Sequence, residues 1–283
     1  MQLKDYFPDI DKKHKNIFFS GICFDSTKVK KNDIFFAIEG ATNDGNKFIP
    51  IAIKKGSKII VTEKNIKNSQ NGILFIYTKK IRKLLAEISF KMHKKRPKNL
   101  IAVTGTNGKS SVANFYYQIL KLSKKKVASI GTLGVKSSTV NFDLSNTTID
   151  PLQLGQILEK LHSNKIDNVI MEASSHGLNQ NRLDGLKFNT GIFTNLSQDH
   201  LDYHKNFRNY LNAKLYLFEK LIKKGGNVIT DEEIPQFKKI KKISKNNILK
   251  VQTLNDKNNF KILSHIFEGE SQILKIKYKN ISR

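Results

Sequence analysis

Residues 100–122, LIAVTGTNGKSSVANFYYQILKL, decide the fold. The first residues form a short apolar strand pattern, and SVANFYYQILKL has the spacing of a helix. The loop between them contains Gly105 and Gly108, which allow a tight turn with inward-pointing N–H groups at a helix N-terminus. This context predicts a phosphate-binding loop, in which Lys109 reaches the β- and γ-phosphates and the Ser110 hydroxyl ligates Mg²⁺. A glycine turn that only joins strand to helix is the alternative, but it leaves Lys109 and Ser110 unexplained.

The sequence around this loop predicts an α/β domain with a mostly parallel sheet. Continuous apolar runs separated by helical stretches are typical of parallel strands buried on both faces. The runs are LIAVT (100–104), VASIG (127–131), NVIMEAS (168–174), TGIFTNL (190–196) and NVIT (227–230). The stretch FKILSHIFEGESQILKIKYKN (260–280) instead alternates about Glu268-Gly269 and predicts an antiparallel hairpin.

The first hundred residues predict a smaller α/β domain. Expected strands are IFFSGICF (17–24), DIFFAI (33–38), KIIVT (58–62) and ILFIYT (73–78). Expected helices are FIPIAIKKG (48–56) and RKLLAEISFKMHKK (82–95), the second ending before Pro97. We therefore place the domain boundary at Pro97, with one domain at 1–97 and a central domain at 98–283.

Composition limits the classes of partner and compartment. The net charge of +26 suggests anionic partners, but the lysines are scattered through nearly every segment, which favours a solvated surface over a polynucleotide or membrane site. Cys23 is the only cysteine, so it is expected to be a core residue in a reducing compartment. With no apolar leader or membrane span, a cytoplasmic monomer is expected.

Polar residues follow two further strands. Glu172 and Ser174 follow NVIM, and His200 lies in TNLSQDHLDYH after GIF. Ligands bind at the carboxyl ends of strands in open α/β sheets. Glu172 and His200 are therefore predicted, together with Ser110, to bring Mg²⁺ against phosphate oxygens. A hydrogen-bonded role near a strand end is the alternative for either residue taken alone.

Three motifs carry a resemblance to a known family. The variant loop TGTNGKS, with Val103 where the common P-loop has glycine, resembles the Mur ligases and folylpolyglutamate synthetases. MEASSHGLNQNR and TNLSQDHLDYH resemble one branch of the Mur ligases, the UDP-N-acetylmuramoyl-tripeptide synthetases. These enzymes phosphorylate a carboxylate with ATP, and an amine then attacks the acyl phosphate to give an amide.

The resemblance implies roles for individual residues. ATP contacts are implied for Gly105, Thr106, Asn107, Gly108, Lys109, Ser110 and Ser111. Contacts with UDP-MurNAc-L-Ala-D-Glu are implied for Asn146, Thr147, Thr148, Ser174, Gln180 and Arg182. Arg182 has the plainest physical case, because a guanidinium pairs bidentately with a carboxylate. In the same family a lysine matching Lys214 is carbamylated and helps to hold a second Mg²⁺, whereas the sequence alone would make Lys214 an exposed helix lysine.

The first domain resembles the family's uridine-binding elements. The matching positions are Phe24, Ser26, Ala41, Thr42 and Asn43. Family members commonly have arginine after the serine, whereas this chain has Thr27, so the resemblance does not carry over the contact made by that arginine. An ordinary strand end and glycine-rich turn is the alternative.

The resemblance implies an ATP-dependent ligase that joins a diamino acid, either meso-diaminopimelate or L-lysine, to the D-Glu of UDP-MurNAc-L-Ala-D-Glu. It ends inside or just after the central domain, so the family's third domain, which closes over ATP and selects the amino acid, is expected to be absent. Two alternatives remain. A folylpolyglutamate-synthetase-like ligase shares the loop chemistry, although such enzymes begin close to their phosphate loop. A nucleotide-binding module without turnover is the other.

Overall fold

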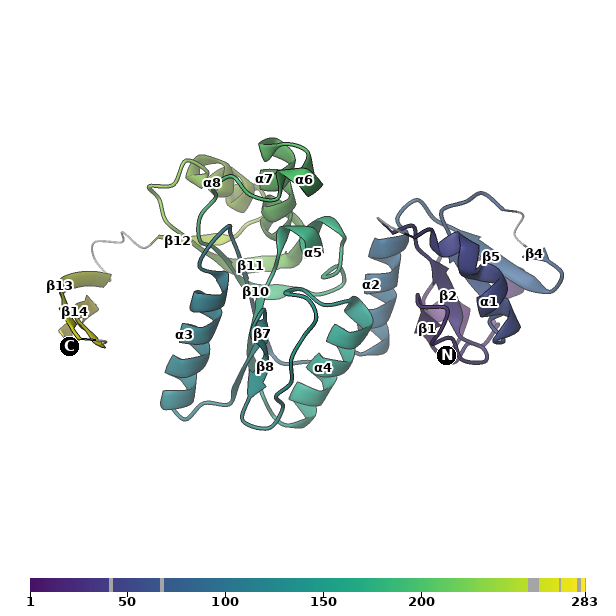
Figure 1. The fold of residues 1–283 in the computed structure, drawn as a ribbon, viewed down its shortest axis with the longest axis horizontal. Helices are drawn as coiled ribbons and strands as arrows, with labels where there is room; N and C mark the ends of the chain where they lie inside the picture. Colours follow the sequence, from purple (N-terminus) through teal and green to yellow (C-terminus); the bar gives the residue numbers. More distant parts are fainter. Residues whose placement is uncertain (41–42, 67–68, 254–259, 270, 279–280, 283) are drawn as a thin grey trace. The chain divides into compact units, whose positions relative to one another are not determined.

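The computed structural model describes residues 1–40, 43–66, 69–253, 260–269, 271–278 and 281–282 (Figure 1). It forms two compact units. Unit 1 contains Met1–Lys94, Asp150–Ile157 and Gln180–Gly185, and unit 2 contains Lys95–Ile149, Leu158–Asn179 and Leu186–Arg283. Both units contain parallel strands and helices, so the predicted α/β class is confirmed. The single cut at Pro97 stays a prediction, since unit 1 also takes in two later segments.

Unit 1 is built on a five-stranded sheet of order β1-β2-β3-β5-β4, parallel except for β4. Its strands are β1 (Ile22–Cys23), β2 (Ile34–Ala37), β3 (Ile59–Thr62), β4 (Ser69–Gln70) and β5 (Ile73–Tyr77). Its helices are α1 (Ile49–Lys54) and α2 (Ile81–Met92), with short turns η1 (Leu3–Asp5), η2 (Lys12–His14) and η3 (Gly45–Phe48).

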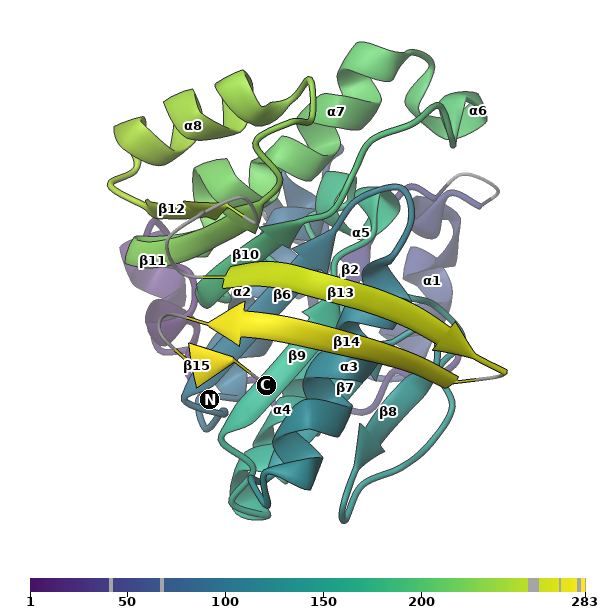
Figure 2. The same ribbon diagram turned by 90° about the vertical axis from the view of Figure 1, so that its left-hand side faces the viewer.

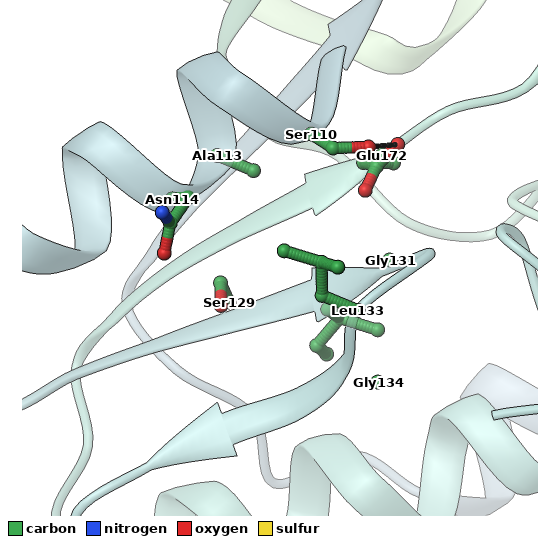
Figure 3. Close-up of a pocket in the computed structure, with 9 residues that line it drawn as sticks. Ser110, Ala113, Asn114, Ser129, Gly131, Leu133, Gly134 and Glu172 are labelled. Atoms are coloured by element: carbon green, nitrogen blue, oxygen red, sulfur yellow. Dashed lines mark hydrogen bonds between the residues drawn. The ribbon is translucent and has the colours of Figure 1, made fainter. Parts of the chain in front are cut away.

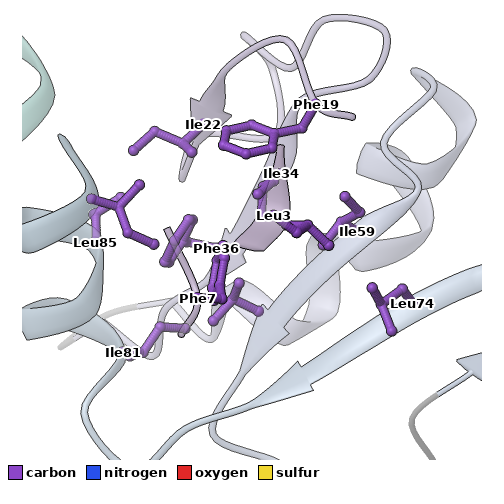
Figure 4. Close-up of a cluster of buried hydrophobic side chains, with 12 residues drawn as sticks. Leu3, Phe7, Phe19, Ile22, Ile34, Phe36, Ile59, Leu74, Ile81 and Leu85 are labelled. Atoms are coloured by element: carbon purple, nitrogen blue, oxygen red, sulfur yellow. The ribbon is translucent and has the colours of Figure 1, made fainter. Parts of the chain in front are cut away.

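The core of unit 1 lies between this sheet and α2 (Figure 4). Phe36 and Ile34 of β2 and Ile81 and Leu85 of α2 are at most 3% exposed. Burying side chains of this size stabilises a fold by about 1.5–3 kcal/mol each. Cys23 is also buried, at 8% exposed, as expected of a core residue.

The expected elements of unit 1 are shorter than predicted, most of all the strand at 17–24. Only Ile22 and Cys23 of the predicted strand 17–24 pair with β2. Phe18 instead forms a single antiparallel bridge with Gln2, and the apolar run IFF (17–19) hydrogen-bonds to residues 1–3 rather than to the sheet. Helix α2 ends at Met92, before the predicted Lys95.

Unit 2 contains a seven-stranded sheet of order β12-β11-β10-β6-β9-β7-β8, parallel except for the β7–β8 pair. Its strands are β6 (Asn99–Thr104), β7 (Val127–Gly131), β8 (Gly134–Ser137), β9 (Asn168–Glu172), β10 (Phe188–Phe193), β11 (Ile222–Thr230) and β12 (Lys250–Thr253). The five predicted central strands are confirmed. Because β6 lies between β9 and β10, their carboxyl ends lie at one edge of the sheet.

Helices complete unit 2. They are α3 (Lys109–Leu122), α4 (Pro151–Ser163, whose first residues belong to unit 1), α5 (Ser175–Asn179), α6 (Leu201–His204), α7 (Phe207–Tyr216) and α8 (Phe237–Asn246), with the π-helical turn η4 (Leu217–Leu221) after α7. Figure 2 shows α7 and α8 beside each other near β11 and β12.

The predicted C-terminal hairpin is confirmed. Strands β13 (Phe260–Glu268) and β14 (Ser271–Tyr278) pair antiparallel, and β15 (Ile281–Ser282) pairs with β14. Across the described residues, none of the helices is long and apolar enough to span a bilayer.

Candidate active site

The predicted phosphate loop connects the end of β6 to the first residue of α3. Gly105 and Gly108 have φ values of +153° and +81°, a region that favours glycine. A Cβ at Gly105 would overlap the Thr194 hydroxyl oxygen. Glycine at 105 is therefore required by both backbone conformation and packing.

The chain that follows β10 holds this loop in place. The Asn107 amide donates to Asn195 Oδ1 at 2.9 Å, and the Thr194 hydroxyl donates to the Asn107 carbonyl at 2.7 Å. The Thr106 amide donates to the Asn195 carbonyl at 3.0 Å. Sequence reasoning gave no role to Thr194 or Asn195, although their place after an apolar strand beside the loop was a usable signal.

The Lys109 side chain lies against the predicted phosphate-binding loop. Its Nζ donates to the carbonyl oxygens of Gly105 and Thr106 at 3.0 and 2.8 Å. Burial lowers the pKa of Lys109, and the negative charges of Glu172 and Asp199 oppose that change. The ammonium is thus held at the loop by backbone oxygens.

Glu172 meets Ser110 at the end of β9 (Figure 3). Ser110 Oγ donates to Glu172 Oε2 at 3.0 Å, and the Thr132 amide donates to Glu172 Oε1 at 2.9 Å. Glu172 is 3% exposed. Gly131 makes room for it, because a Cβ there would overlap the Glu172 carboxylate. Thr132 was not predicted, although it directly follows the strand VASIG.

The donor set at Glu172 fits Mg²⁺. A buried carboxylate beside hydroxyl groups offers the hard oxygen ligands that this ion prefers, and none of the ion pairs found among the described residues involves Glu172. The same part of the chain contains no group of three or more His, Cys, Asp or Glu side chains arranged to hold a metal. Ser110 and Glu172 would therefore need phosphate and water oxygens to complete a coordination sphere.

His200 lies in a different group of side chains. Its Nε2 is 3.4 Å from Asp199 Oδ2, and its ring packs edge-on against His176 at 4.8 Å between centroids. No hydrogen bond among the described residues joins His200 to Glu172. The structure brings Ser110 and Glu172 together, while the predicted metal role of His200 stays a prediction.

Lys214 is the clearest departure from expectation based on sequence alone. Its side chain is 1% exposed rather than solvated, and its Nζ donates to the Gly105 carbonyl at 2.7 Å. Burial and then repulsion by Lys109 lower the pKa of Lys214 to about 7. The ammonium also lies 4.5 Å from the centre of the Tyr210 ring.

Tyr210 joins Lys214 to the loop and was missed by sequence reasoning. It is 0% exposed, and its hydroxyl lies 3.1 Å from Thr106 Oγ1. Tyr210 and Lys214 are four residues apart on α7, so both face the same side of the helix. This spacing was the available signal.

Three residues assigned to substrate contacts lie near Glu172. Thr148 Oγ1 donates to the Glu172 carbonyl and accepts from the Ser174 amide, at 3.0 and 2.9 Å. Thr147 Oγ1 lies 3.0 Å from Thr132 Oγ1. Asn146 is exposed and its amide donates to Ser145 Oγ at 3.3 Å.

The remaining assigned residues belong to unit 1. Arg182 Nε and Nη2 both donate to Gln180 Oε1, at 3.0 and 2.8 Å. Phe24 is 39% exposed, Ser26 is buried and Asn43 is exposed. Ala41 and Thr42 lie outside the described residues. Thr27 turns back onto Asp25, donating through both its amide and its hydroxyl.

This fold and loop define a nucleotide-binding α/β protein of the P-loop type with a separate α/β unit. Residues 103–282 match the model of the Mur ligase middle domain, and residues 19–97 match that of the Mur ligase family catalytic domain. The chain belongs to the Mur ligase family.

Individual relatives agree with this assignment. The chain is 41% identical over 248 residues to a Rickettsia montanensis protein named UDP-N-acetylmuramoyl-L-alanyl-D-glutamate--2,6-diaminopimelate ligase, covering 86% of this chain and 51% of the relative. A solved structure of a ligase of the same name matches with a TM-score of 0.84 at 24% identity, covering 100% of this chain and 58% of that one. A Mycobacterium tuberculosis folylpolyglutamate synthase solved with ADP matches with a TM-score of 0.54 at 12% identity, over 69% of this chain and 50% of that one. At these identities the two structures show the fold alone, and the chain spans about half the length of the curated relatives it matches.

Proposed function

We propose that this chain forms the substrate- and nucleotide-binding part of an ATP-dependent amide ligase of peptidoglycan precursor synthesis. The substrate is UDP-MurNAc-L-Ala-D-Glu, ATP activates its D-glutamyl carboxylate as an acyl phosphate, and a diamino acid attacks. The names of the relatives favour 2,6-diaminopimelate over lysine as that amino acid.

The observation that carries the proposal is the hydrogen bond from buried Lys214 to the Gly105 carbonyl. Placing a second lysine beside Lys109 has an energetic cost, because a buried cation next to another cation is repelled by it. A lysine with a pKa near 7 has a substantial neutral fraction at neutral pH. A neutral amine can take up CO₂, and the resulting anion would relieve this repulsion.

Different residues of the chain would bind the phosphates, the metal ions and the substrate. Lys109 and the loop amides would hold the phosphates and stabilise charge that develops during transfer. Ser110 and Glu172 would hold Mg²⁺, which supplies neutralisation of phosphate charge, and His200 and carbamylated Lys214 would hold a second ion. Thr147, Thr148 and Ser174, which lie beside Glu172, would orient the substrate.

Folylpolyglutamate synthesis is the weaker alternative. Residues 19–97 match a Mur ligase family model, and the folate enzyme matches a smaller share of this chain than the diaminopimelate ligase does. A module that binds nucleotide without turnover would have the same phosphate loop, so the loop alone does not distinguish it from the ligase.

Calorimetry tests the proposal against both alternatives. We expect the 283-residue chain to bind UDP-MurNAc-L-Ala-D-Glu and to show no affinity for folate. Binding of folate but not of the UDP-sugar peptide would reverse the assignment. If the chain bound ATP but neither UDP-MurNAc-L-Ala-D-Glu nor folate, the result would favour a nucleotide-binding module without turnover.

The carbamate has its own test. After equilibration with ¹³C-bicarbonate at pH 8, we expect a carbamate resonance that Lys214→Ala removes and that Lys220→Ala, a change of an exposed lysine on η4, retains. A wild-type spectrum without that resonance in the presence of Mg²⁺ and nucleotide would contradict carbamylation.

A further inference from the structure

In the described part of unit 2, one face of the seven-stranded sheet is covered by a single helix. Helix α3 joins β6 to β7, whereas the helices before β9, β10, β11 and β12 belong to connections that cross the sheet in the opposite direction. Because such connections are right-handed, α3 lies on one face and the other helices lie on the opposite face. Figure 1 shows α3 on one side of the strands and α5 on the other. Parallel sheets are normally covered on both faces, so further cover is expected on the α3 face.

Apolar side chains on the α3 face remain partly in contact with water. Ile192 packs in the apolar cluster that includes α3, and Ile229 shares its face because the two are register partners in parallel strands. Both are half-buried. Phe115, Ile119 and Leu122 of α3 are all at least 61% exposed, and their i, i+4, i+7 spacing places them on one side of the helix. We call these three residues the α3 stripe.

The C-terminal hairpin has an apolar face of its own. Leu274 and Ile276 lie on one face of β14, and Phe267 shares that face because it pairs with Gln272. Phe267 and Leu274 are 68% and 49% exposed. The opposite face is more polar and contains Ser264, Ile266, Glu268, Ser271, Ile273, Lys275 and Lys277. A small antiparallel sheet gains stability in water when its apolar face packs against another element such as a helix.

The connection is long enough for the hairpin to reach the α3 stripe. Residues 254–259 separate β12 from β13, and a chain of that length spans at most about 20–25 Å. Strand β6, which leads into α3, is the third strand from β12, a distance of about 14–15 Å. The remaining length allows the step from the sheet to the outer side of the helix.

We propose that the hairpin of β13 and β14 docks on the α3 stripe through the face that carries Phe267 and Leu274. The interface removes two apolar surfaces from water, which is its driving force. The tether favours the hairpin of the same chain over a second copy, because a short linker gives an effective concentration in the millimolar range. Docking covers the outer side of the helix that begins at Lys109. It involves no ligand, so it is independent of the ligase proposal.

Hydrogen exchange of the full 283-residue chain, followed by mass spectrometry, tests the docking. Ile119→Ser changes only α3, yet it should speed the exchange of amides in residues 263–277 about tenfold, because the hairpin loses protection when an apolar contact is removed. Lys121→Ser is the matched control, since Lys121 is exposed on the same helix outside the stripe. It should leave the exchange of the hairpin unchanged.

A second pair of variants tests which face of the hairpin docks. Leu274 and Ile273 are neighbours in β14 on opposite faces, and they are 49% and 47% exposed. Leu274→Ser should speed exchange of the hairpin amides about tenfold more than Ile273→Ser does. Each change removes a similar apolar side chain from the same strand, so a hairpin without a partner would respond equally to both. All four changes are at exposed positions, and circular dichroism checks that each variant is folded.

Three results would contradict this docking. Equal exchange of the hairpin in Ile119→Ser and Lys121→Ser would show that α3 does not hold it. Exchange in Ile273→Ser as fast as in Leu274→Ser would show that the apolar face of the hairpin is not the one that packs. Protection that falls when the wild type is diluted would assign the contact to a second copy of the chain, because docking within one chain does not depend on concentration.

Discussion

Lys214 Nζ donates a 2.7 Å hydrogen bond to the carbonyl oxygen of Gly105, which ties the last turn of α7 to the phosphate loop. Lys109 Nζ donates to the same oxygen at 3.0 Å. Two lysines thus share one acceptor, and the more buried of them has its pKa lowered to about 7. Because the charge of Lys109 is one cause of this lowered pKa, a ligand that neutralises Lys109 at the loop should change the pKa of Lys214.

The first prediction concerns stability against pH in CO₂-free buffer. The pKa of Lys214 is about 7 in the folded chain and about 10.4 in an unfolded chain. Between these values the unfolded state binds one more proton than the folded state, so the free energy of unfolding rises with pH by up to about 1.4 kcal/mol per unit. Below pH 7 both states are protonated and this contribution is constant.

Urea unfolding of the wild type and of Lys214→Met, at several pH values, measures this pH dependence of the free energy of unfolding. The stability difference between the two should shift in favour of the wild type from pH 7 to pH 9, whereas Lys220→Met should give a constant difference. A Lys214→Met difference that is the same at pH 6 and pH 9 would show that Lys214 titrates normally.

Lys109→Ala should abolish measurable ATP binding while the chain stays folded. The variant loses hydrogen bonds to two loop carbonyls, which costs at most about 1–3 kcal/mol of stability. Loss of a cation that contacts phosphate should lower ATP affinity by at least about a hundredfold. Calorimetry measures both wild type and variant, with Lys121→Ala on the same helix as control. Unchanged ATP affinity would contradict the loop assignment.

The sequence predicted the parts of this fold that depend on local pattern. The five predicted strands of unit 2 contain short, mostly apolar runs, and the loop of Gly105 and Gly108 is set by glycine at positions with positive φ. The burial of Lys214 could not be derived from NYLNAKLYLFEKL, because a helix lysine is buried only when another element packs over it. Here Gly105, far away in sequence, accepts the hydrogen bond of Lys214, and Thr106 contacts the neighbouring Tyr210.

The site residues also include some that local sequence pattern predicts and some that depend on long-range packing. Glu172 was predictable because it ends an apolar strand. The room for its carboxylate is provided by Gly131, which lies forty-one positions earlier in the sequence and is adjacent only through the pairing of β7 with β9. Long-range packing of this kind leaves no periodic signal in a single sequence.

Gly131→Ala should impair Mg²⁺-dependent nucleotide binding more than stability. An added Cβ would overlap the Glu172 carboxylate, which would have to move away from Ser110. We expect ATP affinity in the presence of Mg²⁺ to fall about tenfold or more, from loss of one charge-assisted contact. Ser129→Ala, in the same strand, is the control. If the variant bound ATP in the presence of Mg²⁺ as tightly as the wild type, the position of the Glu172 carboxylate would not matter for Mg²⁺-dependent nucleotide binding.

Arg182→Lys should weaken binding of UDP-MurNAc-L-Ala-D-Glu by about tenfold or more. The guanidinium of Arg182 is oriented by two hydrogen bonds to Gln180 Oε1, an arrangement that a single ammonium cannot reproduce. Calorimetry with the substrate measures the change, and ATP affinity serves as the internal control. Wild-type affinity for the substrate in the variant would exclude Arg182 as its carboxylate ligand.

The last prediction is that the 283-residue chain binds UDP-MurNAc-L-Ala-D-Glu but forms little or no amide. The phosphate loop, Glu172 and Lys214 all lie within the chain, so contacts with ground-state ligands should be retained. The chain spans 51% of its Rickettsia montanensis relative, and amide formation also needs the amine held in line with the acyl phosphate and water excluded. Closure of a further domain usually provides both effects. The assay is ATP-dependent incorporation of radiolabelled diaminopimelate by the chain alone and by the chain fused to the remaining part of that relative. We expect turnover only in the fusion, and removal of Mg²⁺ should abolish it. Robust turnover by the chain alone would mean that positioning and protection of the acyl phosphate are already complete within these two units.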